Sequence, residues 1–253
     1  MEGRVNSQIS DNIATIEFFH PQSNSLPGAV LRSLAEAIET AGSNDDVNVI
    51  VLRSGGDKAF CAGASFDELV AIESLDQGRT FFSGFASVIN AIRKAPKFVL
   101  ARVQGKAVGG GVGLASAADY TFATANSAVK LSELAVGIGP FVVGPAVERK
   151  IGTSAFQQLS INATEWQSAQ WAREKGLYAE VFETIQEMDV AIDLLAKRLS
   201  SSNPEAMRML KMASWTGTDH WDTLLTERAA MSGALVMSDF TRNAIARFKS
   251  GAR

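Results

Sequence analysis

The sequence predicts an α/β fold that is followed by a C-terminal helical segment. Over about the first 150 residues, short apolar runs alternate with stretches of helical periodicity, a pattern typical of α/β folds. A Ser-Ser-Ser-Asn-Pro break at 200–204 separates this part from a remainder of helical character. We therefore expect an α/β core at residues 1–200 and a helical segment at residues 201–253.

Individual elements of the core follow from these patterns. Apolar runs predict strands at 13–18, 48–53 and 98–103, and helical periodicity predicts helices at 29–41 and 78–94. The last helix of the core is expected at 188–199. One face of it is apolar, formed by Met188, Ile192, Leu195 and Leu199.

The C-terminal segment begins with a helix-start signal. Asn203 is suited to cap a helix, and Pro204 to occupy its first position, so helices are expected at 205–214 and 221–247. The segment carries more large apolar side chains than a short tail can hide on itself, so we expect them at contacts between subunits. These side chains are Trp215, Trp221, Leu224, Leu225, Met231, Leu235, Phe240 and Phe248.

Composition excludes several classes of partner. The 253 residues include 20% charged and 46% apolar side chains, and the net charge of −3 gives no support to a nucleic-acid or anionic-membrane partner. A single cysteine, Cys61, forbids an internal disulfide and fits a reducing compartment. The sequence has no apolar run of about 18 residues and no apolar segment of the signal-peptide kind near its start, so a cytoplasmic protein is expected.

Five glycines fall within nine positions at 105–113, between an apolar run and an Ala-rich segment. A strand that passes through glycines into a helix leaves backbone N–H groups free at the positive end of the helix dipole, where an anion binds well. The spacing of Gly109, Gly111 and Gly113 matches neither a P-loop nor a complete dinucleotide fingerprint. Two interpretations remain: an oxyanion hole, or a turn that allows close packing of helix and strand.

Two segments about 45 residues apart, KAFCAGASFDEL at 58–69 and GKAVGGGVGLASAADY at 105–120, resemble the enoyl-CoA hydratase/isomerase (crotonase) superfamily. Further matches in the same order lie at 12–26, with a Pro-x-x-Asn turn, and at 131–140, 149–152 and 163–178. The resemblance covers nearly the whole chain. It implies a spiral of ββα units whose trailing helices pack trimers, and therefore a homotrimer or a dimer of trimers.

The resemblance also implies an acyl-CoA or enoyl-CoA substrate, with no cofactor beyond the coenzyme A of the substrate itself. The backbone N–H groups of Ala62 and Gly110 would form an oxyanion hole for the thioester carbonyl. Backbone groups of the 62–66 loop would hold the adenine. The substrate-binding residues implied in this way are Ala62, Ala64, Ser65, Phe66, Gly109, Gly110 and Gly113.

The acid/base residues depart from the family pattern. Hydratases of the family carry two glutamates, and this chain matches the later one with Glu133 but has Gly113 at the earlier position. Isomerases of the family use one carboxylate, which takes a proton from one carbon of the allylic system and returns it to another. The single Glu133 therefore favours double-bond isomerisation.

Two other functions stay open. The chain could be a hydratase, for example of a branched or carboxylated enoyl-CoA. Asp67, Glu68 or another acid would then be the second acid, or a carboxylate of the substrate would assist. It could also be an acyl-CoA binder without catalytic activity. His20, His220 and Cys61 lack the partners of a nucleophilic or metal site, so no metal is expected.

Overall fold

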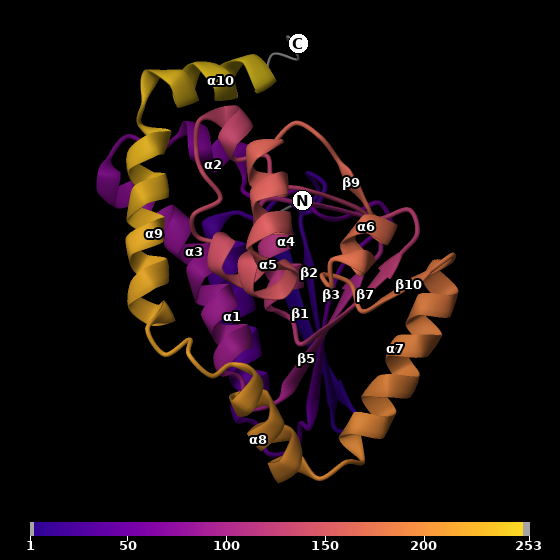
Figure 1. Cartoon of the computed structure of the whole chain (residues 1–253). Helices are drawn as coiled ribbons and strands as arrows, with labels where there is room; N and C mark the ends of the chain where they lie inside the picture. The colour runs from indigo at the N-terminus through magenta and orange to yellow at the C-terminus, as the bar shows by residue number, and fades with distance from the viewer. Residues whose placement is uncertain (1–2, 250–253) are drawn as a thin grey trace.

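The computed structural model describes residues 3–249, with side chains described up to residue 247 (Figure 1). Two sheets form its centre, and the α/β class expected from the sequence is confirmed. The strands are β1 (Arg4–Ser10), β2 (Ile13–Phe19), β3 (Val49–Ser54), β4 (Ala59–Cys61), β5 (Phe98–Val103), β6 (Lys106–Val108), β7 (Tyr120–Thr124), β8 (Ala128–Lys130), β9 (Gln167–Ser168) and β10 (Glu180–Phe182).

The larger sheet has the strand order β1-β2-β3-β5-β7-β10, and the smaller one has the order β4-β6-β8-β9. Strands β1 and β2 form an antiparallel hairpin, whose turn places Asp11 and Asn12 at positive φ. All other pairs of the larger sheet are parallel. The expected strands at 13–18, 48–53 and 98–103 are confirmed as β2, β3 and β5, three neighbours in this sheet.

Helices cover both faces of the larger sheet. The helices of the chain are α1 (Gly28–Ser43), α2 (Phe66–Val70), α3 (Leu75–Lys94), α4 (Gly110–Ala117), the 3₁₀ turn η1 (Leu134–Val136), α5 (Gly144–Ile161), α6 (Ala169–Glu174), α7 (Ile185–Ser200), α8 (Pro204–Ser214), α9 (Trp221–Val236) and α10 (Asp239–Lys249). Helices α1 and α3 pack into the main core, whereas α7 covers the opposite face through Met188, Ile192 and Ala196 (Figure 1). The Asn203 side chain caps α8, as expected.

The C-terminal segment differs from its expectation in two ways. The helix expected at 221–247 is two helices, α9 and α10, and α10 turns across the end of the molecule to contact α2 and η1 (Figure 1). Trp221 and Leu225 are buried within the chain itself, since α9 packs along α3, so they are not available to another subunit. Phe240 stays 67% exposed, and the side chain of Phe248 lies outside the described residues.

The contact between α3 and α9 is a backbone contact at two glycines. A Cβ atom on Gly78 would stand 2.8 Å from Cα of Gly233, and one on Gly233 would stand 2.6 Å from the backbone nitrogen of Arg79. The two helices can approach this closely only because neither glycine has a side chain. This crossing brings Ser232 of α9 to the wall of a cavity.

Candidate active site

A cavity of about 70 Å³ lies where the ends of β4 and β6 meet the first turn of α4. The segment 132–143 forms another side of it, and α2, α3 and α9 complete the wall. The residues that line it include Ala62, Ala64, Phe66, Gly109, Gly110, Glu133, Phe82, Phe85, Phe141, Val143 and Ser232.

The glycine-rich segment forms the turn into α4. Gly109 has φ +51°, in the region that favours glycine, and it precedes the helix without a side-chain cap. Its carbonyl accepts the N–H groups of Val112 and Gly113, which closes the first turn. The N–H of Gly110 lies at the helix start, and among the described residues it has no hydrogen-bond acceptor. It is therefore a backbone donor without an acceptor in the cavity wall.

A second such donor belongs to Ala64, and here the structure corrects the assignment of Ala62. The Ala62 N–H already donates to the carbonyl of Ser23 at 3.1 Å, so it is not available to a ligand. Leu26 bonds the residues on either side of Ala64: its N–H donates to the Gly63 carbonyl, and its carbonyl accepts the Ser65 N–H. This pairing leaves the Ala64 N–H with no acceptor in the described part of the chain.

The two donors are held close together by Gly63. A Cβ atom on Gly63 would stand 3.1 Å from the carbonyl oxygen of Val108 and 3.8 Å from the backbone nitrogen of Gly110. Gly63 also has φ +89°, a second reason for glycine at this position. The segment before Ala64 thus packs directly against the turn before α4.

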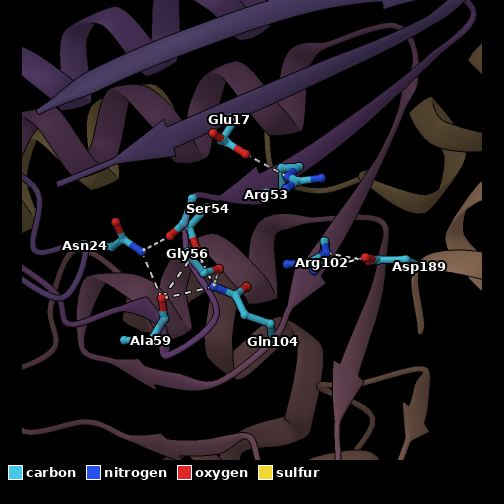
Figure 2. Close-up of polar contacts among 10 residues, drawn as sticks. Glu17, Asn24, Arg53, Ser54, Gly56, Ala59, Arg102, Gln104 and Asp189 are labelled. Atoms are coloured by element: carbon cyan, nitrogen blue, oxygen red, sulfur yellow. Dashed lines mark hydrogen bonds and ion pairs between the residues drawn. The ribbon is translucent and has the colours of Figure 1, made fainter. Parts of the chain in front are cut away.

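A polar network anchors the strand that leads into this segment (Figure 2). The carbonyl of Ala59 accepts hydrogen bonds from Nδ2 of Asn24 at 2.9 Å and from Nε2 of Gln104 at 3.1 Å. Asn24 also bonds the carbonyl of Gly55, and Gln104 bonds Oγ of Ser54. These buried side chains fix the position of β4, and through it the position of Ala62 and Ala64.

Glu133 is the carboxylate of the cavity. It immediately precedes η1, and its Oε1 atom lies 2.8 Å from the position that a Cβ would take on Gly109. Its Oε2 atom is buried and has no hydrogen-bond partner among the described residues. Burial raises the pKa of Glu133 to about 7, because the charged form is poorly solvated there. Glu133 can therefore both accept and return a proton near neutral pH.

The position of the absent second glutamate is closed. Gly113 lies inside α4 under Val143, whose Cγ1 atom would be 2.5 Å from a Cβ on Gly113. Gly113 is not part of the cavity wall, contrary to the expectation that it binds substrate. Ser65 is also not part of the wall, because its side chain caps α2 by accepting the N–H of Glu68.

The two alternative acids have structural contacts elsewhere. Oε2 of Glu68 accepts the N–H of Gly28 at 2.8 Å and so caps α1, which has no side-chain cap of its own. Oδ2 of Asp67 accepts a hydrogen bond from Gln22. Neither residue lines the cavity. Glu133 is thus the one carboxylate in the wall that the described residues form.

The remaining sequence candidates lie away from the wall. His20 lies in the turn after β2, where burial lowers its pKa, and His220 precedes α9. Cys61 is buried, and burial raises the pKa of its thiol to about 12, which makes it unreactive. Over residues 3–249, no group of three or more His, Cys, Asp and Glu side chains is arranged to hold a metal ion.

Six of the expected site residues line this one cavity, namely Ala62, Ala64, Phe66, Gly109, Gly110 and Glu133. Val143 and Ser232 also line this cavity, and no local pattern in the sequence marks either of them. The Phe85 ring lies against Gly110, 2.1 Å from where its Cβ would be, and Ser232 comes from α9. No helix in the described part of the chain is both long and apolar enough to cross a membrane.

Comparison with known proteins gives consistent matches. The model of the enoyl-CoA hydratase/isomerase family matches residues 8–249. The chain is 34% identical to the mitochondrial methylglutaconyl-CoA hydratase of Mus musculus over 195 residues, which are 75% of this chain and 61% of the mouse protein. It is 26% identical to the peroxisomal Delta(3,5)-Delta(2,4)-dienoyl-CoA isomerase of Arabidopsis thaliana over 68% of this chain and 66% of that protein.

A solved structure shows the same fold. The enoyl-CoA hydratase of Bacillus halodurans superposes with a TM-score of 0.88 at 21% identity, over 96% of this chain and 98% of that one. The match confirms the expected crotonase-like arrangement of the α/β core. The chain spans about three fifths of the length of the mouse relative.

Proposed function

Because the chain belongs to the enoyl-CoA hydratase/isomerase family, we propose that it binds an acyl-CoA thioester in the cavity and moves a carbon–carbon double bond with Glu133 as its single acid/base. One observation carries this proposal. A lone carboxylate with a pKa of about 7 shares its cavity with two backbone N–H groups that have no acceptor in the described structure.

The thioester carbonyl would accept hydrogen bonds from the N–H groups of Ala64 and Gly110. When Glu133 removes a proton from the α carbon of a 3-enoyl thioester, the electron pair moves through the carbonyl and negative charge develops on its oxygen. The two donors stabilise that charge, an effect that costs about 3–4 kcal/mol when one such donor is lost. Glu133 then returns the proton to the γ carbon, which completes the shift without consuming water.

Burial suits Glu133 to both steps. A carboxyl with a pKa near 7 is a stronger base than an exposed glutamate and is still ionised in a large fraction of molecules at neutral pH. Its position against Gly109 keeps the carboxyl beside the turn that presents the Gly110 donor. The base and the oxyanion donors thus act on one thioester.

Hydration is the second candidate, and the name of the mouse relative favours it. Addition of water requires proton transfer from the attacking water as well as to the α carbon, a task that two carboxylates divide in family hydratases. With Val143 over Gly113 and Glu68 capping α1, Glu133 would have to perform both transfers. We therefore rank isomerisation first, and binding without catalysis last.

The proposal extends to coenzyme A and to assembly. Ala62, Ala64 and Phe66 line the cavity on the side of the loop that would hold the adenine. Helices α8 to α10 would pack a trimer or a dimer of trimers of a cytoplasmic enzyme. Six large apolar side chains of these helices are exposed among the described residues, namely Met209, Leu210, Met212, Met231, Leu235 and Phe240.

A panel of acyl-CoA substrates tests the proposal directly. Purified protein is incubated with 3-enoyl-CoA and 2-enoyl-CoA of equal chain length, and products are separated by chromatography. We expect 3-enoyl-CoA to be converted to 2-enoyl-CoA faster than 2-enoyl-CoA is converted to 3-hydroxyacyl-CoA. Faster hydration would favour the second candidate. No turnover, combined with binding of both thioesters, would favour a non-catalytic binder.

A further inference from the structure

The part of the cavity wall that the proposed chemistry does not use is mostly apolar. Phe82, Phe85 and Phe141 contribute aromatic rings, and aliphatic side chains fill most of the rest. Ser132, Glu133 and Ser232 are the polar side chains of the wall. No Lys, Arg or His lines it within residues 3–249.

This wall disfavours an acyl group with a negative charge. A carboxylate brought from water into an apolar cavity needs a cation or several hydrogen bonds to offset its lost hydration. The described wall offers no cation. The ionised form of Glu133 would also repel a second carboxylate in the cavity. That repulsion would raise the pKa of Glu133 further.

The cavity is also small. Its volume is about 70 Å³. Phe85 cannot move toward Gly110, because its ring already lies against that backbone. The space therefore suits a short acyl chain.

Ser232 supplies a polar but uncharged group to this wall. It is only 1% exposed, and its neighbour Gly233 makes the backbone contact with Gly78 that fixes α9 against α3. Ser232 is the residue of α9 that lines the cavity. A hydroxyl can both donate and accept, so it can bond an uncharged oxygen of a ligand.

We propose that the cavity selects short acyl groups without a negative charge and that Ser232 recognises an uncharged oxygen, a hydroxyl or a keto group, on the acyl chain. This inference rests on the proposed binding of acyl-CoA, and it names the substrate class of that site. It counts against a carboxylated enoyl-CoA, one of the substrates that the sequence left open.

Binding of saturated thioesters tests the selectivity without depending on catalysis. Butanoyl-CoA and succinyl-CoA have the same chain length and differ by a terminal carboxylate. By calorimetry at pH 8 we expect butanoyl-CoA to bind at least about 100-fold more tightly, since the carboxylate has no partner in the wall. We expect decanoyl-CoA to bind at least about 10-fold more weakly than butanoyl-CoA.

The outcomes separate this inference from the proposed function. Succinyl-CoA binding within about threefold of butanoyl-CoA would overturn the charge selectivity while leaving the acyl-CoA site intact. Equal binding of decanoyl-CoA would overturn the size limit. Failure of all three thioesters to bind would refute the acyl-CoA site itself, and this inference with it.

The role of Ser232 is tested by a ratio of affinities. We expect wild-type protein to bind one enantiomer of 3-hydroxybutanoyl-CoA about 3–10-fold more tightly than butanoyl-CoA, the value of one neutral hydrogen bond. Ser232→Ala should abolish this preference. Ser87→Ala, on the exposed side of α3, is the matched control and should keep it. A preference that survives Ser232→Ala, or that is absent from the wild type, would overturn the role of Ser232.

Discussion

The Cγ1 atom of Val143 lies 2.5 Å from the position that a Cβ atom would take on Gly113. The Cβ atom of Val143 is itself only 2.7 Å from that position, so even alanine at 143 would leave no room for a side chain at 113. The two residues are 30 positions apart in the sequence, and their contact excludes a side chain at position 113. Position 113 of α4 therefore requires glycine, because the side chain of residue 143 packs directly on its backbone.

This packing predicts the behaviour of a restored second acid. Gly113→Glu alone should lower the free energy of unfolding by about 1–3 kcal/mol or more, because it overpacks a buried contact. The double variant Gly113→Glu/Val143→Gly should recover much of that loss and should raise the ratio of hydration to isomerisation. Urea denaturation and product analysis measure the two effects. A single variant as stable as the wild type would show that Val143 does not close this position.

The reassignment of the oxyanion donor makes a separate prediction. Ala64→Pro removes an N–H that bonds no described residue, so the protein should stay folded and lose activity by about 10²–10³-fold. Ala62→Pro removes the donor to the Ser23 carbonyl, so it should chiefly lower the melting temperature. Turnover and thermal unfolding are measured for both. Full activity in folded Ala64→Pro protein would exclude Ala64 as a donor.

Burial of Glu133 should make stability depend on pH. The folded chain holds the Glu133 proton more tightly than the unfolded chain, with a pKa of about 7 against an ordinary 4.5. The contribution of Glu133 to the free energy of unfolding therefore falls as the pH rises from about 4.5 to about 7. Glu133→Gln removes the effect, so it should be more stable than the wild type at pH 8, by up to about 3 kcal/mol.

At pH 4 the two proteins should have similar stability, because the wild-type carboxyl is then protonated in both states. Chemical denaturation at the two pH values measures the difference. Glu68→Gln is a suitable comparison, since that carboxylate caps α1 and its loss should destabilise the protein at pH 8. A Glu133→Gln variant less stable than the wild type at pH 8 would contradict the burial of an unpartnered charge.

Assembly can be tested on α8. Met209 and Met212 are both 59% exposed, and they give this helix an apolar outer surface. We expect light scattering to show a trimer or a dimer of trimers at micromolar concentration. Met209→Glu/Met212→Glu should shift the mass toward the monomer. Val190→Glu, on α7, is the control and should leave the mass unchanged. A monomeric wild-type protein would refute this assembly.

The central strands could be predicted from the sequence because β3 and β5 contain continuous apolar runs, and in β2 every second residue is buried. Strand β1 was missed, since most of its residues are polar and exposed. Strands β4, β6, β8 and β9 have only two or three residues each, too few to show a period. The break between α9 and α10 was also missed, because no Gly or Pro marks it in the sequence.

The residues of the site, too, could be predicted only in part from the sequence. Motif order located Glu133 and the glycine turn, but the choice between Ala62 and Ala64 depends on a hydrogen bond to Ser23, nearly 40 residues away. Ser232 reaches the cavity only because two glycines let α3 and α9 touch. Contacts of this kind are set by tertiary packing, and one sequence alone does not contain a local signal for them.

The central claim is that Glu133 is the single acid/base, and one measurement tests it most directly. The rate of 3-enoyl-CoA isomerisation is followed from pH 5 to pH 9 for the wild type and for Glu133→Gln, with binding of a saturated acyl-CoA measured alongside. For the wild type, kcat/KM should rise with pH and level off above about 7, because the base must be ionised. Glu133→Gln should bind the thioester with similar affinity and lose about 10²–10⁴-fold in kcat at every pH. A Glu133→Gln variant that keeps the wild-type rate and pH profile would contradict the account.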